Sequence, residues 1–129
     1  MEYYNSIIVK GKNFKDLRQE IEVALKTEGF GILTEIDFQA TMKNKLNKEI
    51  LPHTILGACN PVFADKVVSL DPHVSTMLPC NVTMRQLENG DIEVASINPE
   101  AAMGSIDNSA IEEYAKEINE KLNRVLANI

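Results

Sequence analysis

The chain has 129 residues, of which 44% are apolar and 25% are charged, a balance typical of a globular domain and not of a disordered chain. Nineteen acidic residues against thirteen Lys plus Arg give a net charge of −6, which argues against a general nucleic-acid binder because phosphate neutralisation needs surplus positive charge. Two cysteines are too few for a disulfide scaffold, and no apolar run approaches the ~20 residues of a membrane-spanning helix. The N-terminal residues lack the pattern of a secretory signal, so we expect one cytoplasmic domain over residues 1–129 with reduced thiols and no nucleic-acid or membrane partner.

Hydrophobic periodicity divides the chain into strands and helices. Alternation and β-branched residues predict strands over residues 2–9, 30–37, 54–58, 77–87 and 92–97. Apolar residues spaced by three and four predict helices over residues 14–28, 38–46 and 61–70, and from residue 107 or 108 to 129.

Local signals mark where several of these elements begin and end. Asn13 is a cap for the first long helix, and Gly29 falls where its C-terminus favours a left-handed residue. Asn60-Pro61 is a strong helix start, because Asn caps the free amides and Pro fits the first helical position. Asn89-Gly90 predicts a hairpin between the last two strands.

The predicted order is therefore β-α-β-α-β-α-β-β-α, which indicates an α+β fold. The long amphipathic helices each carry one apolar stripe, so we expect them mainly on one face of the sheet, in a two-layer α/β sandwich. The hairpin makes part of the sheet antiparallel, and we expect a mixed sheet.

Charge avoids one segment of the chain. Between Leu51 and Met84 only Asp65, Lys66 and Asp71 are charged, and this stretch contains both cysteines. Such a segment is typical of a core, an interface or a pocket lining.

Each cysteine precedes an asparagine. Cys59 comes directly before the predicted helix cap, where the positive helix end favours a thiolate. Cys80 follows Pro79 within a strand pattern, which predicts an edge strand or a bulge. If the two strands are neighbours, both thiols face one cavity.

Several readings of these residues remain open. Cysteine is among the most buried residue types, so each thiol is also explained as a small core residue. Asn60 is explained as a helix cap, whereas Asn81 lies in a strand, where Asn is disfavoured and its amide needs a partner. Two cysteines about twenty residues apart, without CxxC or HxxxH spacing, fit no standard zinc site, so we expect no metal. Phosphate-loop, dinucleotide and hydrolase motifs are absent, and no cofactor is indicated.

The run ILGACNP over residues 55–61 and the run LPCNV over residues 78–82 resemble the signature of the domain-of-unknown-function 302 family. The resemblance extends over essentially the whole chain, although Ser75 stands where family members often carry Gly. It implies a small α/β fold that tends to form homodimers, and it implies no established reaction. It also implies that one shared feature of the fold contains the following residues: Cys59, Asn60, Pro61, Pro79, Cys80 and Asn81.

Three functions are compatible with this segment. The first is a homodimeric small-molecule-binding or accessory domain without catalysis of its own, with a ligand pocket near Cys59-Asn60 and Cys80-Asn81. The second is a thiol or redox enzyme in which Cys59 is the activated thiol and Cys80 the resolving partner. The third is a structural protein-interaction module that pairs with another copy.

Overall fold

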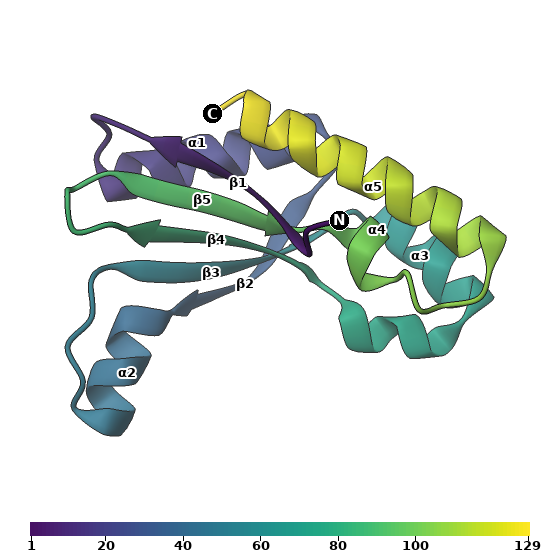
Figure 1. Ribbon diagram of the computed structural model, residues 1–129, viewed down its shortest axis with the longest axis horizontal. Helices are drawn as coiled ribbons and strands as arrows, with labels where there is room; N and C mark the ends of the chain where they lie inside the picture. Colours follow the sequence, from purple (N-terminus) through teal and green to yellow (C-terminus); the bar gives the residue numbers. More distant parts are fainter.

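The structure, a computed structural model, describes residues 1–129 and contains a five-stranded sheet with helices around it (Figure 1). The strands are β1 (Tyr4–Val9), β2 (Gly31–Asp37), β3 (His53–Cys59), β4 (Cys80–Gln86) and β5 (Ile92–Ile97). The helices are α1 (Phe14–Thr27), α2 (Phe38–Leu46), α3 (Pro61–Leu70), the 3-10 helix η1 (Pro72–Met77), α4 (Pro99–Ala102) and α5 (Ser109–Ala127). No helix is both long and apolar enough to cross a membrane.

The sheet has the order β1-β5-β4-β3-β2, and every neighbouring pair is antiparallel. The expectation of a mixed sheet is therefore wrong. Two strands that run in the same direction, β1 and β2, are joined by α1 but lie at opposite edges. The shorter helices α2 and α3 lie towards the ends of the sheet and lead back into antiparallel neighbours, so neither forms a parallel crossover (Figure 1).

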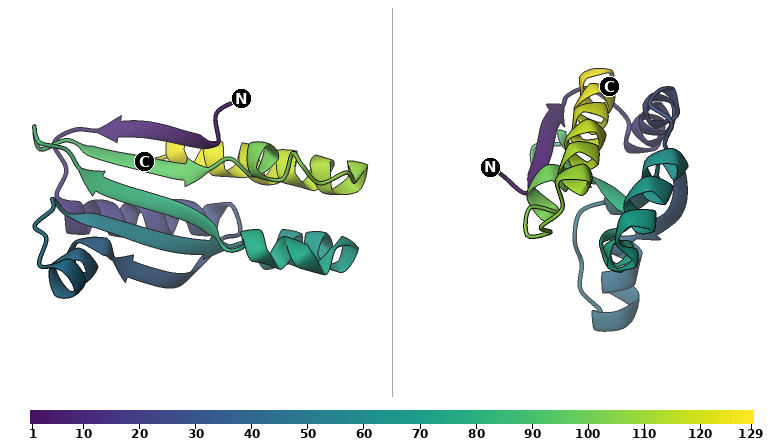
Figure 2. Two further views of the ribbon diagram at one scale, coloured as in Figure 1. Left: turned by 60° about the horizontal axis from the view of Figure 1, so that its bottom comes forward. Right: turned by 90° about the vertical axis from the view of Figure 1, so that its right-hand side faces the viewer.

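The two long helices lie against the same face of the sheet, behind the strands in the left view of Figure 2. Each carries one buried stripe, which includes Leu17 and Ile21 in α1 and Ile118 and Leu122 in α5. These side chains pack on the inward-facing residues of the strands in a core of 17 buried residues. The main core is thus one layer between helices and sheet, and it leaves the opposite face of the strands without a long helix (Figure 2).

A second, smaller core lies beyond the end of the sheet. It joins Val67 of α3, Val74 of η1, Met103 after α4, and Ile111 and Ala115 of α5. Helix α5 takes part in both cores because its 19 residues extend past the strands (Figure 2). The long helix therefore fixes the helical extension relative to the sheet.

The observed order differs from the predicted one by two short elements, η1 and α4. The predicted strand over 77–87 begins only at Cys80, because residues 72–77 form the 3-10 helix after Pro72. The irregular stretch expected after Pro99 contains the four-residue helix α4, which Asn98 caps. The hairpin at Asn89-Gly90 is confirmed, with Gly90 at a φ of 92°.

Candidate functional site

The two Cys-Asn motifs lie at one end of the sheet, where β3 ends and β4 begins. Strand β3 pairs with β4, and Ala58 is opposite Cys80 while Gly57 is opposite Asn81. The expectation that these strands are neighbours is confirmed. Strand β4 is a central strand, however, so the expected edge or bulge at Cys80 is wrong. Pro79 lies just before the strand, where a missing N–H costs no ladder hydrogen bond.

The two thiols do not share a face of the sheet. Cys80 is opposite Ala58, and both are buried in the main core. Cys59 follows Ala58 in the same strand, and successive side chains of a strand point to opposite faces, so Cys59 is directed to the other side. Both cysteines are free and Cys59 is half-buried. Burial first, and the neighbouring Cys59 second, raise the pKa of the Cys80 thiol to about 11, which keeps Cys80 neutral and poorly nucleophilic at ordinary pH.

Asn60 is a buried structural asparagine that uses both ends of its amide. Its Oδ1 accepts a hydrogen bond from the backbone N–H of Phe63, as a cap of α3, and its Nδ2 donates to the backbone carbonyl of Glu28 at 3.1 Å. Gly29, at a φ of 83°, lies so close that a Cβ there would be 3.1 Å from Asn60 Nδ2. The amide therefore joins the start of α3 to the end of α1, and Pro61 occupies the first, exposed position of α3.

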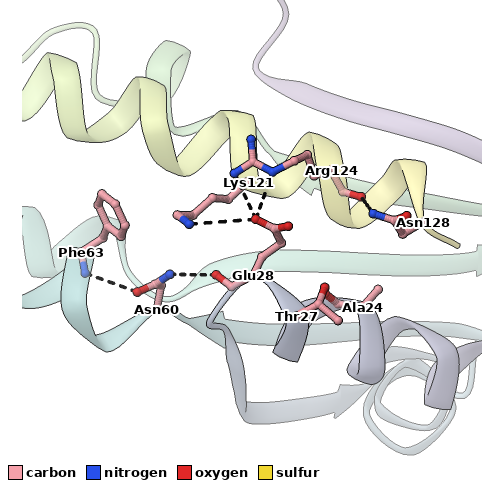
Figure 3. Close-up of polar contacts among 8 residues, drawn as sticks. All are labelled: Ala24, Thr27, Glu28, Asn60, Phe63, Lys121, Arg124 and Asn128. Atoms are coloured by element: carbon pink, nitrogen blue, oxygen red, sulfur yellow. Dashed lines mark hydrogen bonds and ion pairs between the residues drawn. The ribbon is translucent and has the colours of Figure 1, made fainter.

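The side chain of Glu28 extends this junction to α5 (Figure 3). Its Oε1 accepts from Arg124 Nε at 3.1 Å and lies 3.9 Å from Lys121 Nζ. The Lys121 ammonium in turn lies 5.6 Å from the centre of the Phe63 ring. Three helices, α1, α3 and α5, thus meet beside Asn60. This side chain, which the sequence predicts as a site residue, stabilises the fold.

Asn98-Pro99 repeats the arrangement of Asn60-Pro61. Asn98 is also buried, its Oδ1 caps α4 through the N–H of Ala101, and its Nδ2 donates to the backbone carbonyl of Glu2 at 3.0 Å. Strands β3 and β5 run in the same direction, so both asparagines lie at the same end of the sheet. The second Asn-Pro pair is visible in the sequence, but only the structure shows that it has the same role.

Pro79 packs over the centre of β3. A Cβ built on Gly57 would lie 2.8 Å from Pro79 Cγ and would also clash with Thr34 Oγ1. Glycine is therefore required at this position by space and not by backbone conformation. Three features of the motifs, Gly57, Asn60 and Pro79, thus have structural explanations.

The outward-facing side of the sheet, which we call the uncovered face, has no long helix over it (Figure 2). Helix α2 reaches only its corner, where the rings of Phe38 and His53 lie 5.1 Å apart. From the strand registers, the face comprises Tyr4, Ser6 and Ile8 of β1, Thr34 and Ile36 of β2, His53, Ile55, Gly57 and Cys59 of β3, Asn81, Thr83 and Arg85 of β4, and Glu93, Ala95 and Ile97 of β5.

A groove of about 770 Å³ lies on part of the uncovered face. Its floor is formed by β4 and β5, and one end is bounded by the segment after η1. The groove is lined by residues that include Met77, Leu78, Pro79, Asn81, Thr83, Arg85, Glu93, Ala95, Ile97 and Tyr4. Of the six predicted site residues, Pro79 and Asn81 line this groove, whereas Cys59, Asn60, Pro61 and Cys80 do not.

One ion pair marks the far end of the groove. Arg85 Nε donates to Glu93 Oε1 at 2.7 Å across the β4–β5 pair. His53 lies opposite Arg85 on β3, and burial, together with the positive charge of Arg85, lowers the pKa of its imidazole. The groove thus has an apolar end near Met77 and a polar end near Arg85. Asn81 and Thr83 lie between these ends.

The sequence analysis did not predict that Thr83, Arg85, Glu93 and Ala95 line a groove. Their alternation within two predicted strands is visible, but it does not show which face a helix covers. That depends on the strand order and the path of α1 and α5.

A profile of the family "Domain of unknown function DUF302" matches residues 6–129. The chain belongs to the DUF302 family. The crystal structure of an uncharacterized conserved DUF302 protein from Bacillus stearothermophilus superimposes on this chain with a TM-score of 0.91 at 26% sequence identity, and the match covers 99% of this chain and 98% of that one. A search of curated proteins gives no match. Membership in the DUF302 family explains the paired motifs and the fold, and it assigns no reaction to them.

Proposed function

We propose that this DUF302 protein is a cytoplasmic, homodimeric small-molecule-binding or accessory domain whose ligand occupies the groove on the uncovered face. The observation that carries the proposal is the groove itself, about 770 Å³ and lined by Pro79 and Asn81. This volume lies within the range of ~300–1,000 Å³ that is usual for small-molecule sites. The proposed pocket is thus over β4 and β5, on the face that Asn81 shares with Thr83, and neither cysteine lines it.

The lining supports an amphipathic organic ligand. Met77, Leu78 and Ile97 offer apolar contacts, and the exposed amide of Asn81 offers a donor and an acceptor. Thr83, two positions further along β4, adds a hydroxyl on the same side. A molecule with an apolar body and one or two polar groups fits this distribution.

Thiol chemistry receives less support from the geometry. A resolving Cys80 has to reach the surface as a thiolate, yet it is buried in the main core with a pKa raised to about 11. The small-molecule-binding domain is therefore the function that we favour.

The test combines native mass spectrometry with a fluorescent probe. Freshly purified protein should retain an adduct mass, and the amphipathic dye 8-anilino-1-naphthalenesulfonate should show enhanced fluorescence in its presence. Ala95→Phe, which fills the groove floor, should remove both signals, whereas Val23→Phe on the exposed side of α1 should leave them unchanged. The absence of any adduct, together with dye fluorescence unaffected by Ala95→Phe, refutes the proposal.

A further inference from the structure

We propose that the groove binds a zwitterionic amphiphile, an apolar molecule whose head group carries both a carboxylate and an ammonium group, as an α-amino acid does. Arg85 and Glu93 bind this head group, and the apolar end of the groove contacts the rest of the ligand. The proposal rests on the proposed function for the use of the groove, and it adds the chemical class of the ligand.

The ion pair between Arg85 and Glu93 uses only part of each side chain. Arg85 Nε donates to Glu93 Oε1 at 2.7 Å, and neither side chain has another hydrogen bond within the protein. A guanidinium has five N–H donors and a carboxylate has two acceptor oxygens, so both Nη amines of Arg85 and Oε2 of Glu93 are available to a ligand. The two side chains are 50% and 22% exposed and both line the groove, so a ligand in the groove can reach these groups.

The sheet sets the spacing of the two charged groups. Arg85 and Glu93 are direct partners in the β4–β5 register, and both strands lie inside the sheet with a neighbour on either side. Side chains that are directly opposite one another have Cβ atoms about 5 Å apart. This spacing suits a head group whose two charges are attached to one carbon atom, because the guanidinium and the carboxylate can contact it at the same time.

The charge of the groove favours a head group without net charge. Arg85 and Glu93 are the only charged residues that line the groove, and burial, followed by the charge of Arg85, lowers the pKa of the adjacent His53, so its imidazole is neutral at pH 7. A carboxylate bound to Arg85 lies beside the Glu93 carboxylate, and an ammonium bound to Glu93 lies beside the guanidinium. A ligand with a single charge is therefore repelled by one member of the pair, whereas a zwitterion places each of its charges next to the opposite one.

An uncharged, fully apolar ligand is disfavoured for a different reason. Such a ligand would cover the Nη amines of Arg85 and the Oε2 of Glu93 and displace their water without replacing its hydrogen bonds. The polar end of the groove thus selects for a charged head group, and its neutrality selects for a zwitterion.

The rest of the groove fits a slender apolar body. Thr83 and Ala95 are the next outward-facing residues from the ion pair, and these small side chains form the floor of the groove. Ile97 and Met77 line its apolar end. Four residues of strand separate Glu93 from Ile97, which is about 13 Å. The ligand therefore lies extended over β4 and β5, with its head group at the ion pair and its apolar end near Ile97.

The experiment compares three probes that share one apolar body: decanoate, decylammonium and 2-aminodecanoate. Isothermal titration calorimetry at pH 7, below the concentrations at which the probes form micelles, measures their affinities for the wild type. The zwitterionic 2-aminodecanoate should bind at least about tenfold more tightly than either singly charged probe, because it makes one more hydrogen bond between charged groups.

Variants of the ion pair should change which probe binds best. Arg85→Gln leaves Glu93 as the only charge and should favour decylammonium, whereas Glu93→Gln leaves Arg85 as the only charge and should favour decanoate. A surface ion pair contributes little to stability, so both variants should fold, and circular dichroism verifies this. Lys10→Gln and Glu20→Gln make the same changes of net charge in ion pairs outside the groove and should keep the wild-type order of affinities.

Three results overturn the inference: none of the probes binds the wild type, all three bind it equally, or the folded Arg85→Gln and Glu93→Gln variants keep the wild-type order of affinities. The proposed function is judged separately, by the adduct mass and by the dye fluorescence that Ala95→Phe should remove. If those signals are present but the zwitterion has no advantage, the groove binds a ligand of another class and only the assignment of the head group fails. If the adduct, the Ala95-dependent fluorescence and the binding of all three probes are absent, both proposals fail.

Discussion

At the scale of single residues, the buried asparagines of the two Asn-Pro pairs hold distant parts of the chain together. Asn60 and Asn98 each cap a helix and bind a backbone carbonyl from a distant part of the chain. Buried amides with both ends satisfied stabilise a fold and offer nothing to a ligand. Asn81, which is exposed and lines the groove, is the motif asparagine whose amide is available for binding.

Replacing Asn60 tests this distinction. Asn60→Ala removes the α3 cap and also leaves the Glu28 carbonyl without its donor, so we expect the free energy of unfolding to fall by about 2–3 kcal/mol. Asn108→Ala, which removes only the cap of α5, should lower it by about 1 kcal/mol. Urea denaturation measures both, and equal losses contradict the dual role of Asn60.

Gly57 provides a test of the packing of Pro79. Gly57→Ala forces a methyl group against Pro79 and Thr34, so we expect a loss of about 1–3 kcal/mol in unfolding free energy. Gly31→Ala, in β2, adds a Cβ that meets nothing within 4 Å and should change stability by less than about 0.5 kcal/mol. Thermal denaturation of both variants under the same conditions compares the two losses of stability, and equal losses contradict the close packing at Gly57.

The Cys80 thiol predicts a pH dependence at alkaline pH. Its pKa is about 11 in the folded chain and 9.0 ordinarily, so the unfolded chain loses this proton first. The stabilising contribution is complete below pH 9 and is lost as pH rises through 11. Cys80→Val should remove this slope from urea titrations between pH 8.5 and 10.5, whereas Cys59→Ser should keep it. An unchanged slope in Cys80→Val means that other groups cause the alkaline loss.

At the scale of elements, burial separates the helices into two kinds. The helix α1 buries four residues and α5 six, and both pack on the sheet, whereas α2 has no buried residue. Local propensity and the Asp37 cap are sufficient to predict α2 from sequence, yet tertiary packing adds little to its stability. Helices that are all predicted from apolar periodicity therefore differ in how readily they unfold locally.

Amide hydrogen exchange should show this inequality directly. We expect amides of α2 to exchange at least about tenfold faster than those in the middle of α1 and α5, because local opening of α2 exposes little apolar surface. Exchange followed by mass spectrometry of peptic peptides measures it. Equal protection of α2 and α5 contradicts the expectation and indicates that something covers α2 in solution.

At the scale of the whole molecule, the sheet has one face in the main core and one face without a long helix. The groove and the apolar side chains on the uncovered face come from the same topology. Because α1 connects the two edge strands across the helix side, and α5 returns along that side, no segment is left to cover the other.

Association predicts that stability depends on protein concentration. If the folded chain is the homodimer that we propose, the midpoint of thermal unfolding should rise by a few degrees for each tenfold increase in concentration. Differential scanning calorimetry over a hundredfold range of concentration measures it, and a midpoint that does not move in the wild type counts against association.

The sequence by itself determined most of the elements and several of their ends: Asn13, Asn60 and Asn108 cap helices, Gly29 has the left-handed conformation, and the hairpin turns at Asn89-Gly90. These features depend on residues a few positions apart, which periodicity and capping rules describe. Only the tertiary structure decided that the sheet is entirely antiparallel, that Cys80 lies in a central strand, and that the groove lies over Asn81 and Thr83. Strand partners and the face that a helix covers are set by contacts between distant segments, and a pattern of alternation is the same whichever face becomes the core.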